Sequence, residues 1–196
     1  MPRISTVTRK TSETAIELTL DLDGSGRAEI ATGIGFFDHM LTAFARHGML
    51  DLSLRAAGDL HIDAHHTVED VGIVLGQALA EALGEKRGIV RFGHALVAMD
   101  EALAEAAIDL SGRGFLVFDV PFERPMLGTM DSQLVEEFFR ALTANGLFAL
   151  HLTRKAGHNA HHVAEAAFKA AARALRMAVE EDPRARAAIP STKGVL

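Results

Sequence analysis

The sequence predicts an α+β fold of two tandem β-β-α-β-α repeats, each a four-stranded sheet covered by helices. Three observations predict it: the chain repeats itself, each copy alternates strand-like with helical apolar spacing, and each copy carries a His-His-x-x-Glu motif. Aligning Leu52 with Leu150 also superimposes His65 on His161 after a small shift in a polar segment. An insertion in such a segment costs little stability, so one duplicated unit explains nearly the whole chain.

The first repeat opens with strands. Residues 16–22 alternate apolar and polar side chains, the period-two pattern of a half-buried strand, and Gly24 follows in a turn. We expect residues 28–32 to form a hairpin partner for this strand. Residues 6–11 are predicted to supply an extra strand.

A helix, a strand and a longer helix complete the first repeat. Residues 38–46 place apolar side chains at helical spacing and stop at Gly48, and residues 50–54 alternate again as a strand. Residues 67–83 carry an apolar stripe along one helical face, with Gly84 as a C-terminal cap.

The second repeat follows the same order. It predicts a hairpin near residues 105–120, a helix at 132–143, a strand at 147–152 and an alanine-rich helix at 162–181. The expected units are residues 1–98, 99–182 and an irregular tail, 183–196. Helices should cover one face of each sheet, and the other face should meet the sister repeat or another subunit, so we expect a homo-oligomer.

Composition excludes several classes of protein. The 196 residues are 48% hydrophobic and 23% charged, which suits a folded chain rather than a disordered one. With 20 Lys and Arg against 26 Asp and Glu, the charge of -6 argues against nucleic-acid binding. No apolar run is long enough to cross a membrane. The absence of cysteine and of a signal-like start predicts a cytoplasmic protein.

The two His-His-x-x-Glu motifs are the strongest chemical signal in the chain. Four residues of helix turn the chain by about 400°, so His65 and Glu69 lie on one face and can hold one ion. His66 lies about 100° away and points elsewhere. Each motif should therefore serve two different metal ions.

Symmetry between the repeats suggests how two metal sites form. We expect one ion to bind His65, Glu69 and His162. A second ion should bind the mirror set, which is His161, Glu165 and His66. Two positions that align in the repeat are candidates for a fourth ligand: His39 and Glu137. Such nitrogen and oxygen ligands suit Mn, Fe, Co, Ni or Zn, and the sequence leaves open whether ligands come from one chain or two.

A second group of residues could hold an anion. Arg91 and Arg113 lie beside glycines, where an uncrowded backbone allows a guanidinium to grip a phosphate or carboxylate. Lys169 and the tail residues 191–193 could add donors. The alternative for the arginines is a surface salt bridge.

Three segments together resemble the imidazoleglycerol-phosphate dehydratase family: residues 36–41, 63–70 and 155–170. The similarity runs over almost the whole chain. It implies a repeat like the second domain of ribosomal protein S5 and a histidine-biosynthesis enzyme that converts imidazole glycerol phosphate to imidazole acetol phosphate. It further implies two Mn²⁺ ions per active site, sites shared between subunits and a 24-subunit assembly.

The resemblance also implies roles for individual residues. The implied metal ligands are His39, His65, His66, Glu69, His161, His162 and Glu165, with Glu137 in doubt because some family members have histidine there. The implied substrate contacts are Glu13, His39, His47, His65, Glu69, Arg91, Arg113, His161, Lys169, Ser191, Thr192 and Lys193. The catalytic candidates are Glu13, His39, Glu69 and Glu165.

The chemistry of such a dehydration needs an electron sink, because the proton removed has no neighbouring carbonyl. Two ions on the imidazolate form of the substrate ring would help to expel the C3 hydroxyl and acidify the C2 proton, which Glu13 would carry. Two other functions remain open. A dinuclear metallohydrolase would release inorganic phosphate, and a non-catalytic metal-bound cage would need no phosphate-gripping arginine.

Overall fold

The protein was analysed as a computed structural model, which describes residues 2–185 and 188–196. Residues 186 and 187, in the expected tail, and residue 1 lie outside the described residues. Within the described part of the chain, no helix combines the length and the apolar character that a membrane span requires.

The first four-stranded sheet has the order β1-β2-β4-β3. Its strands are β1 (Ile4–Lys10), β2 (Thr14–Asp21), β3 (Ala28–Ala31) and β4 (Asp51–Gly58). The extra N-terminal strand predicted from residues 6–11 is thus confirmed as β1, which pairs antiparallel with β2. On β2, Ile16, Leu18 and Leu20 are buried and face the helices, as the alternating pattern predicts.

The predicted hairpin between β2 and β3 is wrong. β4 lies between these two strands and pairs antiparallel with β2 and parallel with β3. The parallel pair is possible because helix α1 (Gly35–Gly48) connects β3 to β4 as a crossover. Alternation along a strand identifies its buried face but not its neighbour, which is why the pattern could not exclude a hairpin.

The second sheet repeats this topology in the order β5-β6-β10-β7. Its strands are β5 (Phe92–Met99), β6 (Ala102–Asp109), β7 (Phe115–Asp119) and β10 (Ala149–Ala156), and the short strands β8 (Met126–Leu127) and β9 (Met130–Asp131) pair separately. The predicted hairpin over residues 105–120 is also wrong, because β10 separates β6 from β7. Strand β5 was not anticipated and pairs with β6, so residues 92–98 lie in the second sheet. The division into units remains a prediction, and the sheets favour a boundary before Phe92.

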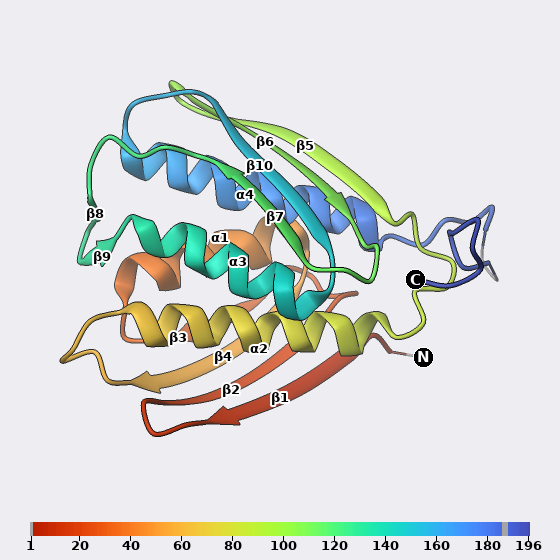
Figure 1. The fold of residues 1–196 in the computed structure, drawn as a ribbon, viewed down its shortest axis with the longest axis horizontal. Helices are drawn as coiled ribbons and strands as arrows, with labels where there is room; N and C mark the ends of the chain where they lie inside the picture. The colour runs from red at the N-terminus through yellow and green to blue at the C-terminus, as the bar shows by residue number, and fades with distance from the viewer. Residues whose placement is uncertain (1, 186–187) are drawn as a thin grey trace.

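Four helices fill the space between the two sheets (Figure 1). Besides α1 they are α2 (His65–Leu83), α3 (Gln133–Gly146) and α4 (Ala160–Val179). Helix α2 packs on β1 and β2, and α4 packs on β5 and β6, while α2 contacts α3 and α1 contacts α4 across the middle. The helices of one repeat therefore cover those of the other, and the outer face of each sheet stays uncovered within the chain.

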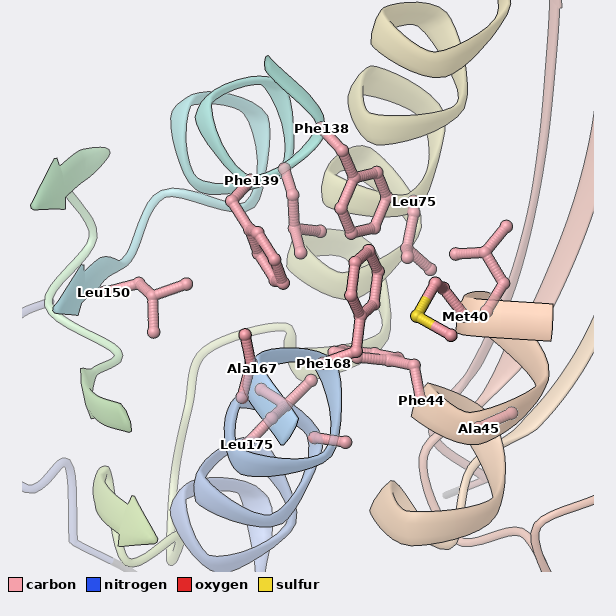
Figure 2. Packing of buried hydrophobic residues seen from close by; sticks show 14 of the residues in the cluster. Met40, Phe44, Ala45, Leu75, Phe138, Phe139, Leu150, Ala167, Phe168 and Leu175 are labelled. Atoms are coloured by element: carbon pink, nitrogen blue, oxygen red, sulfur yellow. The ribbon is translucent and has the colours of Figure 1, made fainter. Parts of the chain in front are cut away.

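Aromatic side chains join the helices at the centre of the core (Figure 2). The rings of Phe138 and Phe168 stack with centroids 5.3 Å apart, Phe37 meets Phe138 at 5.3 Å, and Phe139 meets Phe168 at 4.9 Å. All four side chains are fully buried. Because Phe168 lies one turn after Glu165 on α4, its contacts with Phe138 and Phe139 fix the motif-bearing helix relative to α3.

Glycine allows α2 and α3 to approach closely. A Cβ atom added at Gly76 would lie 2.7 Å from both the carbonyl oxygen of Leu142 and the backbone nitrogen of Gly146. Gly72 is similarly close to the carbonyl of Phe138, at 2.7 Å. These contacts are with backbone atoms, which cannot rotate away.

We expect Gly76→Ala to destabilise the protein by about 1–3 kcal/mol, since the added methyl group forces the two helices apart. Chemical denaturation at fixed protein concentration measures the change. Gly35→Ala is the matched control, because nothing lies within 4 Å of a Cβ added there. Equal stability of the two variants would contradict the close approach.

Candidate active site

Both His-His-x-x-Glu motifs begin at the first turn of a helix, as the sequence predicts. The side chain of Asn159 caps α4 by accepting hydrogen bonds from the backbone nitrogens of His161 (3.0 Å) and His162 (3.4 Å). Asp63 accepts from the backbone nitrogen of His65 at 2.7 Å. These caps satisfy donors that have no partner within the helix and so fix where each motif starts.

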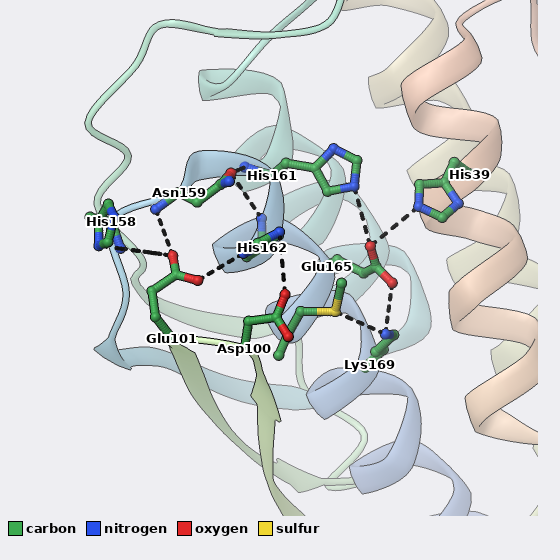
Figure 3. A network of polar contacts seen from close by, with 10 residues as sticks. His39, Asp100, Glu101, His158, Asn159, His161, His162, Glu165 and Lys169 are labelled. Atoms are coloured by element: carbon green, nitrogen blue, oxygen red, sulfur yellow. Dashed lines mark hydrogen bonds and ion pairs between the residues drawn. The ribbon is translucent and has the colours of Figure 1, made fainter.

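Three predicted ligands converge between α1 and α4 (Figure 3). The Oε2 atom of Glu165 lies 3.3 Å from His39 Nε2 and 3.3 Å from His161 Nε2. One ligand atom from each of the three residues lies within 4.8 Å of the others, a spacing that a single ion could bridge. His39 belongs to the first repeat, so its imidazole completes the motif of the second repeat rather than that of its own.

The carboxylate of Glu165 is buried and ionised. Its other oxygen, Oε1, accepts from Lys169 Nζ at 2.7 Å, and Lys169 Nζ also contacts Met99 Sδ at 3.2 Å. Burial opposes ionisation of Glu165, but hydrogen bonds and charge from Lys169 and His39 outweigh it and lower the pKa. Glu165 is therefore a ready acceptor for a cation, and Lys169 lies directly beside it.

The first motif forms a smaller group. His65 Nε2 lies 3.8 Å from Glu69 Oε2, and both side chains are about half exposed. Glu137, which aligns with His39 in the repeat, contacts Arg140 at 3.5 Å instead. In the part of the chain that the structure describes, the only group of three close ligands is that of His39, His161 and Glu165.

The second histidine of each motif turns away from the first. The rings of His65 and His66 make an angle of 85°, and those of His161 and His162 make 86°. His66 Nδ1 lies 3.0 Å from Asp59 and 3.8 Å from Glu13, and His162 Nδ1 lies 2.8 Å from Glu101. Within one chain, the expected sets that join His162 to the first motif and His66 to the second do not form.

The carboxylates opposite His66 and His162 change the pKa values of these two histidines. The hydrogen bond to Glu101 raises the pKa of His162, and that to Asp59 raises the pKa of His66. The same bond from His162, together with the backbone N–H of Asn159, lowers the pKa of Glu101 to about 2. The sequence motifs pointed to neither Glu101 nor Asp59. Glu101 could have been found from the repeat, whereas Asp59 has no counterpart there.

His47 lies at the last turn of α1, two turns beyond His39. Burial lowers its pKa, and the nearby cations Lys169 and Arg173 lower it further. An imidazole that is kept neutral in this way can accept a hydrogen bond from a substrate through one ring nitrogen and donate one through the other.

Apart from Lys169, which pairs with Glu165, the expected anion-binding residues gather in another part of the molecule. Arg91 holds Asp109 through two contacts, at 2.7 and 3.2 Å, and donates to the carbonyl of Pro190 at 2.7 Å. The guanidinium of Arg113 donates to the carbonyl of Ser111 at 3.4 Å. Arg91 therefore orients the tail, while Arg113 and Lys193 keep donors that face outward.

The last residues of the tail, 188–196, lie near these arginines. Ser191 Oγ accepts from the backbone nitrogen of Lys193 at 3.2 Å, and Thr192 and Lys193 are exposed. The turn at Gly112 packs against the carboxyl-terminal Leu196, 2.7 Å from the position of an added Cβ. Arg113 thus follows directly on a residue that packs against the end of the tail.

The His-His-x-x-Glu motifs and the tail occupy opposite ends of the molecule (Figure 1). His161 starts α4, whereas the backbone of Arg91 is hydrogen-bonded to Ala178 near the end of that helix. At 1.5 Å per residue these points are about 25 Å apart. No small molecule can bridge this distance within one chain.

Comparison with known proteins identifies the family. The family model for imidazoleglycerol-phosphate dehydratase matches residues 32–175. The chain is 82% identical over its full length to imidazoleglycerol-phosphate dehydratase of Acidiphilium cryptum and 68% identical to that of Granulibacter bethesdensis, covering 100% of each relative.

Solved structures agree with this fold. The chain is similar to imidazoleglycerol-phosphate dehydratase of Staphylococcus aureus, with a TM-score of 0.83 and 40% identity over 91% of this chain and 99% of that one. The enzyme of Pyrococcus furiosus gives a TM-score of 0.84 and 38% identity over 97% and 100% of the two chains. The fold, the paired motifs and these matches show that the chain belongs to the imidazoleglycerol-phosphate dehydratase family.

Proposed function

We propose that this protein removes water from imidazole glycerol phosphate to give imidazole acetol phosphate, using two Mn²⁺ ions per active site. Membership of the family makes the chain a hydro-lyase of histidine biosynthesis. The observation that carries the mechanism is the cluster of His39, His161 and Glu165, with Lys169 at its edge. A cytoplasmic location, which the composition predicts, is part of the proposal.

The residues of this cluster fit a divalent ion. They offer two imidazole nitrogens and an ionised, buried carboxylate, a donor set that suits Mn²⁺ and leaves room for further ligands. His65 and Glu69 offer the same kinds of atom on the first motif. We assign His66 and His162 as the ligands that each motif lends to the other ion, supplied by a neighbouring subunit.

The bound ions would stabilise the imidazolate form of the substrate ring, whose electrons would help to expel the C3 hydroxyl and so make the C2 proton acidic. Glu13 is suited to take the C2 proton, because its carboxylate is exposed beside His66. His47 and Lys169 would orient the substrate, and Lys169 could stabilise negative charge next to Glu165. Loss of the C3 hydroxyl as water leaves an enol, which becomes the ketone product.

The phosphate would bind at the other end of a neighbouring chain. The donors at that end belong to Arg113, Ser191, Thr192 and Lys193. Arg91 holds the tail in place through the carbonyl of Pro190. The distance between these residues and the metal motifs means that one active site must combine residues of different subunits. A 24-subunit assembly with sites at its interfaces would supply this arrangement.

Product analysis tests the proposal. Purified protein with Mn²⁺ is incubated with imidazole glycerol phosphate, and the products are separated by mass. A phosphorylated ketone, one water lighter than the substrate, supports the dehydratase. Release of inorganic phosphate would instead favour the metallohydrolase, and unchanged substrate would favour the non-catalytic cage.

A further inference from the structure

The two repeats carry equivalent glutamates in the turns before β2 and β6. In the sheets, Leu18 pairs with Leu54 of β4, and Ala106 pairs with Leu152 of β10. Since Leu54 aligns with Leu152 in the repeat, Leu18 aligns with Ala106, and the same register places Glu13 on Glu101. Duplication therefore gave each motif one glutamate opposite its second histidine.

The two glutamates now have different surroundings. The carboxylate of Glu101 accepts from the backbone nitrogen of Asn159 (2.9 Å) and lies 2.8 Å from His162 Nδ1 (Figure 3). Glu13 is about half exposed, and its carboxylate comes no closer than 3.8 Å to His66 Nδ1. Glu101 is held by its neighbours, whereas Glu13 has room to move.

Asp59 occupies the place beside His66 that Glu13 could have taken. Its two carboxylate oxygens lie 3.0 and 3.2 Å from His66 Nδ1. Its backbone nitrogen donates to the carbonyl of Glu13 at 3.1 Å, which ties this loop to the turn that carries Glu13. In the first repeat, Asp59 makes the contact with the second motif histidine that the turn glutamate makes in the second repeat.

We propose that Glu101 and Asp59 are positioning residues that each hold the Nδ1–H of a motif histidine, so that Nε2 faces the metal. His162 and His66 are then fixed in one tautomer and one ring orientation before the ion arrives. Because Asp59 performs this task in the first repeat, Glu13 is released for proton transfer. The inference rests on the proposed function for metal binding by His66 and His162 and for the role of Glu13, and on geometry for the contacts of Asp59 and Glu101 with these histidines.

Mn²⁺ affinity and turnover measured separately test this division of roles. Protein stripped with a chelator is titrated with Mn²⁺ in a calorimeter, for wild type and for Asp59→Asn, Glu101→Gln and Glu13→Gln. Loss of a carboxylate behind a ligating histidine typically weakens metal binding about 10–100-fold, and we expect this for the first two variants. At saturating Mn²⁺ these two should regain most of their turnover, whereas Glu13→Gln should bind Mn²⁺ normally and stay inactive.

Glu17→Gln and Glu105→Gln are the matched controls, since these residues also align in the repeat and lie on the exposed faces of β2 and β6. Circular dichroism and sedimentation check that each variant folds and assembles. If Glu101→Gln does not fold or assemble, the Mn²⁺ affinity of Asp59→Asn alone tests the inference. Unchanged Mn²⁺ affinity in Asp59→Asn, or equal weakening in Glu13→Gln, would overturn the inference. Inactive wild type with normal Mn²⁺ binding would refute the proposed function without affecting this comparison.

Discussion

Replacing Glu13 by glutamine is expected to lower turnover about 10²–10⁴-fold, the usual contribution of a general base or acid. The amide keeps the size of the side chain but cannot take a proton. Glu13 lies on the turn before β2 and is not a member of the cluster of His39, His161 and Glu165. Steady-state kinetics with imidazole glycerol phosphate should therefore show a fall in kcat with bound Mn²⁺ unchanged.

The control for this variant is Glu17→Gln on the following strand, which should keep full activity. Metal content of each protein is measured after dialysis. A Glu13→Gln enzyme with wild-type kcat would contradict the assignment, as would one that loses turnover only because it no longer holds metal.

Glu165→Gln is expected to have the second large effect. Its carboxylate joins His39, His161 and Lys169, and it is the most buried member of the cluster. A neutral amide removes the negative charge that attracts a cation and leaves the ammonium of Lys169 without its partner. We expect loss of about half the bound Mn²⁺ and at least a 10³-fold fall in kcat/KM.

Metal analysis of the purified protein and kinetics at increasing Mn²⁺ measure this outcome. Glu180→Gln, beyond the last turn of the same helix, is the control, since Glu180 lies far from the cluster and its carboxylate pairs with Arg176. If Glu165→Gln retains full metal content and activity, the cluster is not a metal site.

Much of this fold follows from the sequence because duplication and periodicity are local signals. The helical spacing before Gly48 and the two capped motifs predict α1, α2 and α4 close to their observed bounds. Strand order is not local, and both expected hairpins failed for that reason. Strand β5 was missed, and only its pairing with β6 reveals its place.

The site was predictable only in part. Helical geometry correctly separates the ring of His65 from that of His66. It cannot say which helix comes near, so the sequence marked His39 as a candidate ligand without showing that it lies beside Glu165 of the second motif. Arg91 looked like an anion ligand because glycines surround it, yet it holds Asp109 and the tail. Such pairings depend on contacts between residues far apart in the chain.

The claim that one active site combines residues of different subunits is tested most directly by mixing two inactive variants. One carries Glu165→Gln and the other carries Lys193→Ala with Arg113→Ala, so each lacks a different end of the site. The two are dissociated, mixed in equal amounts and reassembled. If each site draws on two chains, about a quarter of the sites receive both intact ends, and about a quarter of wild-type activity should return. Continued absence of activity in a correctly assembled mixture would contradict the account.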